Sequence, residues 1–320
     1  MLLTTFIWGC SYPIGRLALD QLSPWAYGAF RFMFGTLSLL PLALPKRRVP
    51  APLAYSGNDS PLLWLKAGSI SGLCLSIGAI IQLTGMTHLP ASEVGFMTTL
   101  YVSMVPVLAF IIGYIPRLLV VAGLLVGLFG LYLLTGGEGG GFGKNQMLIM
   151  VANVFWALQV IITGHYAMRV NTWMFSLAQA AVASAIALTM AFLGGQLPSW
   201  GLFFQTLPYS MWGILSVGVA YTCQALAQKE LSSTSAALFF PLQSVIGAIL
   251  GVVFLGEAMN TQILIGAGVI ISGCVIAQFA RESIRLTPDH NWWQPMKIAR
   301  YSLGILLVLG TAGGFVWAIS

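Results

Sequence analysis

Eleven apolar runs, each long enough to cross the hydrocarbon of a lipid bilayer, follow one another along this chain of 320 residues. A helix needs about 20 apolar residues to cross about 30 Å of hydrocarbon, so the runs predict transmembrane helices. The residues are 58% hydrophobic and 7% charged, which is more apolar surface than a soluble chain of this length keeps from water. The predicted spans are 2–18, 25–45, 62–85, 91–115, 117–135, 146–167, 172–193, 208–228, 233–255, 261–281 and 301–319.

The basic residues lie mainly in alternate connections between these spans. If the N-terminus is cytoplasmic, the cytoplasmic connections hold eleven lysines and arginines, and the opposite side holds only Arg16 and Lys144. This bias follows the positive-inside rule and predicts a multi-pass protein of a bacterial cytoplasmic membrane, with its C-terminus outside if the eleventh run is a span. The expected partners are the lipid bilayer and a small-molecule substrate. The net charge of +6 needs no nucleic acid to explain it, and the sequence leaves the oligomeric state open.

The first ten spans divide into two similar halves. An offset of 148 residues pairs Trp8 with Trp156, and the same offset places Arg31 opposite Gln179. Because each half has five spans, an odd number, the second half enters the membrane from the opposite face, as in many secondary transporters. The predicted fold is an all-α polytopic membrane protein with an inverted 5+5 repeat of transmembrane helices and an extra C-terminal transmembrane helix. Its parts are a first repeat (1–137), a Gly-rich linker (138–143), a second repeat (144–281), and a cytoplasmic linker with the C-terminal helix (282–320).

Three stretches resemble EamA-type members of the drug/metabolite transporter superfamily. They are FIWGCSYPIGRLALDQLSPWAYGAFRF, GFMTTLYVSMVPVLAF and GVVFLGEAMNTQILIGAGVIISGCVIA. The resemblance implies ten helices in two inverted sets of five, which move amino acids and other amphipathic metabolites, often outward, by alternating access. Two departures stand out. The first half has GYIPRLL (113–119) where the second has LGEAMNT, and 282–320 has no counterpart in the family pattern.

Polar side chains inside the apolar spans are the candidates for binding a solute. An unpaired amide or hydroxyl in hydrocarbon is costly, so such groups turn toward a cavity or toward one another. Tyrosine and tryptophan add rings with one polar atom, which suits an amphipathic solute. Hydrogen bonding between helices and anchoring at the membrane interface remain the alternative roles. The candidates for a substrate cavity are Trp8, Tyr12, Arg31, Gln82, Tyr101, Trp156, Gln159, Gln179, Tyr221, Gln224 and Gln243.

Arg31 is a full charge about two turns inside the second span. Exposure to lipid at that depth costs at least about 2–3 kcal/mol, so we expect the side chain to face the interior of the bundle. There it can pair with helix carbonyls, with a polar network, or with a substrate carboxylate.

Three prolines are also expected inside spans, where proline removes a backbone hydrogen bond. Pro13, Pro106 and Pro241 are therefore candidates for gating kinks, and a static kink packed against its neighbours is the alternative. The four cysteines fall inside spans without metal-ligand spacing and are expected to pack as small apolar residues.

Three other classes of membrane protein are weaker candidates than a secondary transporter: an enzyme, a receptor or assembly protein, and a channel. For a channel, the sequence contains no repeated charged ring or filter-like segment. A membrane-embedded enzyme needs clustered acids, histidines or a metal site, but the three histidines and eight acids are scattered. No catalytic residue, metal or cofactor is therefore expected. A receptor or assembly protein does not need a repeat with polar residues inside the membrane. We expect no carboxylate near mid-membrane, which favours facilitated diffusion or exchange over coupling to protons or sodium ions through an acid.

Overall fold

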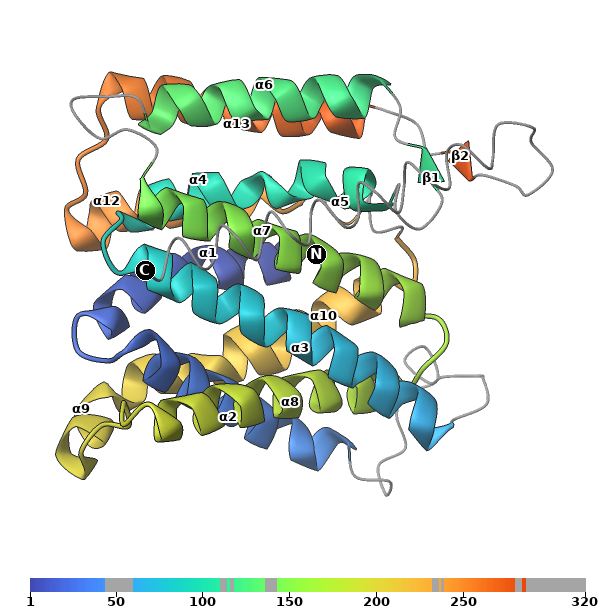
Figure 1. Ribbon diagram of the computed structural model, residues 1–320, viewed down its shortest axis with the longest axis vertical. Helices are drawn as coiled ribbons and strands as arrows, with labels where there is room; N and C mark the ends of the chain where they lie inside the picture. The colour runs from blue at the N-terminus through green and yellow to red at the C-terminus, as the bar shows by residue number, and fades with distance from the viewer. Residues whose placement is uncertain are drawn as a thin grey trace.

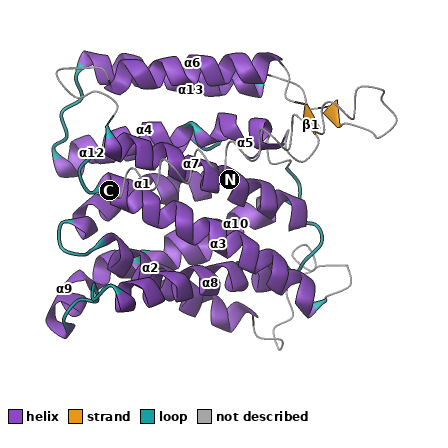
Figure 2. Ribbon diagram, in the orientation of Figure 1, coloured by secondary structure: helices purple, strands orange, loops and turns teal. Residues whose placement is uncertain are grey.

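Apolar segments without water to satisfy their backbone form helices, and helices make up nearly all of the described chain (Figure 2). The computed structural model describes residues 1–43, 60–109, 114–115, 118–135, 143–231, 236, 239–279 and 284–285. Its helices lie side by side, and most run roughly along one direction or against it (Figure 1). The two-residue strands β1 (Tyr114–Ile115) and β2 (Ile284–Arg285) pair antiparallel, with Tyr114 opposite Arg285.

The helices follow the predicted spans in order. In the first half they are α1 (Leu2–Leu19), α2 (Pro24–Ala43), α3 (Pro61–Met86), α4 (Ala91–Thr99), α5 (Tyr101–Ala109) and α6 (Leu118–Thr135). In the second half they are α7 (Lys144–Tyr166), α8 (Thr172–Leu193), α9 (Trp200–Met211), the π-helix η2 (Ile214–Val219), α10 (Ala220–Ala227), α12 (Pro241–Leu255) and α13 (Thr261–Gln278). Of the described helices, α3, α7 and α8 are long and apolar enough to cross a membrane, and α12 and most of α6 and α13 are shorter apolar segments.

Two predicted spans, the fourth and the eighth, are not single uninterrupted helices. The fourth is α4 and α5, which are separated at Leu100. The eighth begins earlier than predicted, at Trp200, and η2 interrupts it before α10. Pro241 does not lie inside the ninth helix as predicted. It is the first residue of α12, where its missing N–H costs no hydrogen bond. The predicted eleventh span, 301–319, lies outside the described residues.

The connections define two faces of the bundle. Face A holds the connections α1–α2, α3–α4, α8–α9 and α12–α13, at the left of Figure 1. Face B holds the α7–α8 connection and the paired strands, at the right. The helix α1 runs from face B to face A, whereas α7, which begins the second half, runs from face A to face B (Figure 1). The helices α2 and α8 are opposed in the same way.

Glycines bring pairs of helices into close contact. A Cβ on Gly213 would overlap the backbone carbonyl of Arg31, and a Cβ on Gly72 would overlap that of Gln179. The crossing of α2 with η2 therefore resembles the crossing of α8 with α3. At the top of Figure 1, α6 lies along α13, where Gly273 meets the backbone of Gly127. Such small residues allow the close approach on which helix packing in membranes depends.

Candidate functional site

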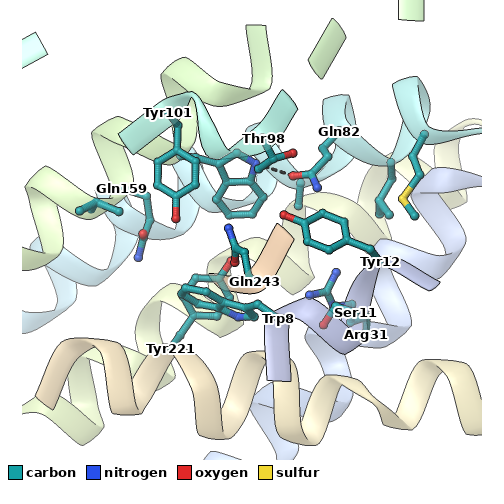
Figure 3. Close-up of a pocket in the computed structure, with 15 residues that line it drawn as sticks. Trp8, Ser11, Tyr12, Arg31, Gln82, Thr98, Tyr101, Gln159, Tyr221 and Gln243 are labelled. Carbon is teal, nitrogen blue, oxygen red and sulfur yellow. Dashed lines mark hydrogen bonds between the residues drawn. The ribbon is translucent and has the colours of Figure 1, made fainter. Parts of the chain in front are cut away.

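A pocket lies between the two halves and is lined by residues near mid-length of α1 and α7. Figure 3 shows its lining side chains in close-up. It contains about 630 Å³ of space free of protein atoms, its open part included. Side chains of α1, α2, α3, α4 and α5 line it from the first half, and side chains of α7, α10 and α12 line it from the second. Nine of the eleven residues proposed from the sequence line this pocket: Trp8, Tyr12, Arg31, Gln82, Tyr101, Trp156, Gln159, Tyr221 and Gln243.

Arg31 is half-buried at the edge of the pocket and is held by the π-helix η2. Its Nε donates a hydrogen bond to Ser216 Oγ at 2.9 Å. The backbone carbonyl of the same serine accepts a hydrogen bond from Trp8 Nε1 at 3.0 Å. The described lining residues include one cation, Arg31, and no acid. The side chain thus faces the bundle interior and belongs to a polar network.

Aromatic rings form much of the remaining wall. Trp8 packs on Tyr221 with ring centroids 4.8 Å apart, and Tyr221 lies nearly parallel to Trp156 at 6.5 Å. Phe240, buried behind the pocket, contacts both Trp8 and Tyr101. These rings offer apolar faces to a ligand and have polar atoms at their edges.

Gln82 orients one of these rings. Its Oε1 accepts a hydrogen bond from Trp156 Nε1 at 2.6 Å, and Figure 3 shows this bond as the dashed line beside Thr98. The amide of Gln243 projects into the same space from α12 (Figure 3). Both halves therefore supply polar groups to the pocket.

Gln179 and Gln224 do not line the pocket. They lie behind Gln159, in a buried cluster that we call the glutamine cluster (Gln159, Gln179 and Gln224). Gln224 Nε2 donates to Gln159 Oε1 at 3.3 Å, and Ser71 Oγ donates to Gln179 Oε1 at 2.9 Å. In the described part of the chain, Gln179 Nε2 has no hydrogen-bond partner. Because α7 runs toward face B and Gln159 donates to Thr163 one turn further on, the cluster lies on the face-B side of the pocket.

The three candidate prolines differ in position. Pro13 is buried inside α1, next to Tyr12 of the pocket wall. Pro106 lies within α5. Pro241 begins α12, two residues before Gln243.

Six further residues line the pocket and were not expected from the sequence: Ser11, Ala79, Leu83, Met86, Thr98 and Val160. The hydroxyl of Ser11 donates to the carbonyl of Ile7 in its own helix at 3.0 Å and accepts from Trp212 Nε1 at 2.8 Å. A serine that bonds to its own helix is common in membrane spans, so its presence gives no signal. The four apolar residues look like any core or lipid-facing residue.

Glu257 lies outside the pocket, at face A, and joins the two halves there. Its carboxylate accepts hydrogen bonds from the backbone N–H groups of Ala91 at 2.5 Å and Ser92 at 3.0 Å, at the N-terminus of α4. In the same first turn of α4, Glu93 Oε1 accepts a hydrogen bond from Gln146 Nε2 at 3.1 Å. Among the described residues no three His, Cys, Asp or Glu side chains gather as metal ligands.

Comparison with known proteins places this architecture among transporters. The model of the EamA-like transporter family matches residues 1–136 and 144–279. An uncharacterized transporter of Archaeoglobus fulgidus is 23% identical over 295 residues, which are 86% of this chain and 83% of that protein. One of Clostridium kluyveri is 24% identical over 292 residues, 86% of this chain and 91% of that protein. A crystal structure of another protein shares the fold, with a TM-score of 0.61 and 22% identity over 87% of this chain and 96% of that one.

Proposed function

The chain belongs to the EamA-like transporter family, and on that premise we propose that it is a secondary carrier which exports small amphipathic metabolites. It is a multi-pass membrane protein and a transporter, not an enzyme. In our proposal the solute binds in the pocket described above, and the two halves expose the pocket to the two sides of the membrane in turn.

The observation that carries this proposal is the position of the pocket. It lies at mid-length of α1 and α7 and receives polar and aromatic side chains from both halves. A site between two halves, near the middle of the membrane, is where carriers built from inverted repeats hold their substrates. The active site of an enzyme that works at one membrane surface would lie near the helix ends instead.

Three observations support an inverted repeat. The two segments that match the family model nearly coincide with the halves 1–137 and 144–281. Corresponding helices run in opposite directions, as α1 and α7 do (Figure 1). The crossing of α2 with η2 has a counterpart in the crossing of α8 with α3. We therefore propose that each half is one five-helix unit, and that the two units enter the membrane from opposite faces.

The charges of the described residues support the orientation. Lys66 near the start of α3, Arg169 just after α7 and Lys229 just after α10 lie at helix ends that reach face B. Arg16 near the end of α1 and Lys144 at the start of α7 lie at helix ends that reach face A. By the positive-inside rule, face B is cytoplasmic in our proposal, and the N-terminus lies on that side. We place the protein in the plasma membrane. In the proposed orientation, export runs from face B to face A.

A solute screen in proteoliposomes tests the proposal. Purified protein is reconstituted and tested for counterflow of labelled organic solutes, with Arg31→Ala and Gln224→Ala as variants and Arg16→Ala as a control outside the pocket. We expect at least one solute to move with the wild type and the control, and its rate to fall about tenfold or more in Arg31→Ala. Vesicles of the two orientations distinguish export from uptake. A folded, monodisperse wild type that moves no solute in either direction would contradict the carrier function.

A further inference from the structure

Arg31 has no carboxylate partner among the described residues that line the pocket. A guanidinium has five N–H donors, and Nε of Arg31 uses one of them on the neutral hydroxyl of Ser216. A charge that is partly withdrawn from water is costly unless an opposite charge pairs with it. The remaining donors of Arg31 are therefore available to a ligand.

No acid that the structure describes neutralises Arg31, because each is engaged or exposed elsewhere. Asp20 pairs with Arg16 at 2.7 Å near face A, and Glu230 is exposed beyond α10. Glu93 accepts from Gln146, and Glu257 binds the N-terminus of α4. The described lining of the pocket thus carries a single positive charge, and a ligand with one negative charge neutralises it.

We propose that the solute of this pocket is a monovalent organic carboxylate with an apolar, ring-bearing body and no ammonium group. The inference rests on the carrier function proposed above and names its substrate class. A guanidinium matches the planar geometry of a carboxylate with two parallel hydrogen bonds, which an ammonium or an amide does not do. Ser11 and Tyr12 lie beside Arg31 in Figure 3, but the Ser11 hydroxyl is already bonded to Ile7 and Trp212, so the guanidinium is the group that binds the carboxylate.

The aromatic wall accounts for the body of the ligand. Trp8, Tyr101, Trp156 and Tyr221 line the pocket, and the rings of Trp156 and Tyr221 lie 14° from parallel. Flat apolar faces of this kind bind a ring or another planar apolar group through dispersion and burial of apolar surface. Polar amides enter this part of the wall only at Gln82, Gln159 and Gln243 among the described lining residues.

The single positive charge of the described pocket lining, Arg31, disfavours two other classes of solute. In an α-amino acid the ammonium is bonded to the carbon that bears the carboxylate, so a carboxylate on Arg31 brings a second cation close to the guanidinium. The described lining offers no acid to offset that repulsion. A phosphate monoester carries up to two negative charges, and Arg31 is the one cation among the described lining residues.

Four probes that share a phenyl group and differ in charge distinguish these solute classes. They are 3-phenylpropanoate (anion), 3-phenylpropanamide (neutral), phenylalanine (zwitterion) and 2-phenylethylamine (cation). Binding to the purified full-length protein is measured by isothermal titration calorimetry. We expect 3-phenylpropanoate to bind at least about tenfold more tightly than each of the others, the range of a hydrogen bond to a charged group.

Three arginine variants assign the preference to Arg31. In Arg31→Gln, which installs the residue that its repeat mate carries, the anion is expected to bind no better than the amide. Arg31→Lys keeps the charge and is expected to keep part of the anion preference. Arg16→Gln makes the same chemical change outside the pocket and is expected to bind like the wild type.

Each other outcome has a defined meaning. Phenylalanine binding as tightly as 3-phenylpropanoate, an anion preference that survives in Arg31→Gln, or no binding of the anion would overturn the substrate class. If the anion binds in an Arg31-dependent way but proteoliposomes do not move it or any solute, the ligand class stands and the carrier function fails. If amino acids or cations are moved while the anion is neither bound nor moved, the carrier function stands and the ligand class fails.

Discussion

Ser216 is the residue through which the π-helix η2 reaches two walls of the pocket. Its hydroxyl accepts from Arg31, and its carbonyl accepts from Trp8. A π-helix is wider than an α-helix, and such segments occur frequently at functional sites. Ser216 is fully buried, so these two bonds have no competition from water. The position of the guanidinium therefore depends on a residue that does not line the pocket.

Ser216→Ala is expected to weaken solute binding without removing the charge. The variant deletes the acceptor for Arg31 and keeps the carbonyl that accepts from Trp8. A hydrogen bond to a charged group contributes about 1.5 kcal/mol or more, so we expect the half-saturation concentration for transport to rise about tenfold. Ser272→Ala is the matched control, because that hydroxyl is exposed and donates to Gly268 of its own helix. An unchanged half-saturation in Ser216→Ala would show that Arg31 does not need this contact.

For single residues, the sequence indicates which side chains are polar and inside a span better than it indicates which of them line a pocket. Arg31, Gln82 and Gln243 are conspicuous because an amide or a charge inside an apolar span has few polar partners available. Ser11 and Thr98 are not conspicuous, since a hydroxyl can be satisfied by its own helix. Which wall Met86 or Val160 lines depends on the rotation of a whole helix, and packing against neighbours sets that rotation.

The crossing of α2 with η2 leaves no room for a side chain at Gly213. A Cβ there overlaps the carbonyl of Arg31, so Gly213→Ala has to push the two helices apart. We expect a loss of about 1–3 kcal/mol, the usual cost of overpacking, measured as a lower midpoint of thermal unfolding in detergent. Gly201→Ala, in α9, is the control. A methyl group at that position meets no atom of the described residues within 4 Å, and we expect equal or higher stability there. Equal midpoints for both variants would contradict the close crossing.

The N-terminus of α4 depends on a carboxylate from the other half of the chain. Glu257 accepts from two backbone N–H groups, of Ala91 and Ser92, that α4 itself cannot satisfy. Glu257→Gln keeps one acceptor and removes the charge that favours a helix N-terminus. We expect it to lower the free energy of unfolding by about 1 kcal/mol. Glu230→Gln, at an exposed position, is expected to leave the unfolding midpoint unchanged. A midpoint equally unaffected in Glu257→Gln would mean that the contact does not stabilise α4.

The helices could be predicted from hydropathy, but their interruptions could not. The break at Leu100 contains neither glycine nor proline, and tertiary contacts surround it. The carbonyl of Thr99 accepts from the thiol of Cys274 at 3.7 Å, and its hydroxyl contacts Ser244. These partners are more than 140 residues away in sequence, so a local pattern does not contain them. Pro241 is a visible signal, but hydropathy alone does not distinguish a proline that starts a helix from one that kinks it.

Across the whole molecule, the two proposed site residues that miss the pocket share one property. In the proposed repeat, Gln179 is the mate of Arg31, and an offset of 142 residues pairs Gln82 with Gln224. Arg31 and Gln82 line the pocket, while their mates are buried in the glutamine cluster on its face-B side. The proposed inverted repeat would produce this division if its two halves adopt different conformations, because each half would then turn different repeat mates toward the pocket.

If the halves exchange their conformations during transport, the exposed members also exchange. The opposite state would bring Gln179 and Gln224 to the pocket wall and pack Arg31 and Gln82 against the neighbouring helices. Burying a charge costs more than burying an amide, so the state in which Arg31 lines the pocket is the more stable of the two. In such a cycle, the difference between Arg31 and Gln179 would give the two states unequal free energies.

Cysteine labelling in oriented vesicles tests this exchange during solute turnover. In a background without the four native cysteines, we expect Gln82→Cys to react with a membrane-impermeant maleimide from face A. Gln224→Cys is expected to react from face B, because the proposed exchange would separate the glutamine cluster and expose this position to that face. Ala187→Cys, at a fully buried position of α8, is the control and should react from neither side. A transporting protein whose Gln224→Cys reacts only from face A, or from neither face, has halves that do not exchange conformations in this way.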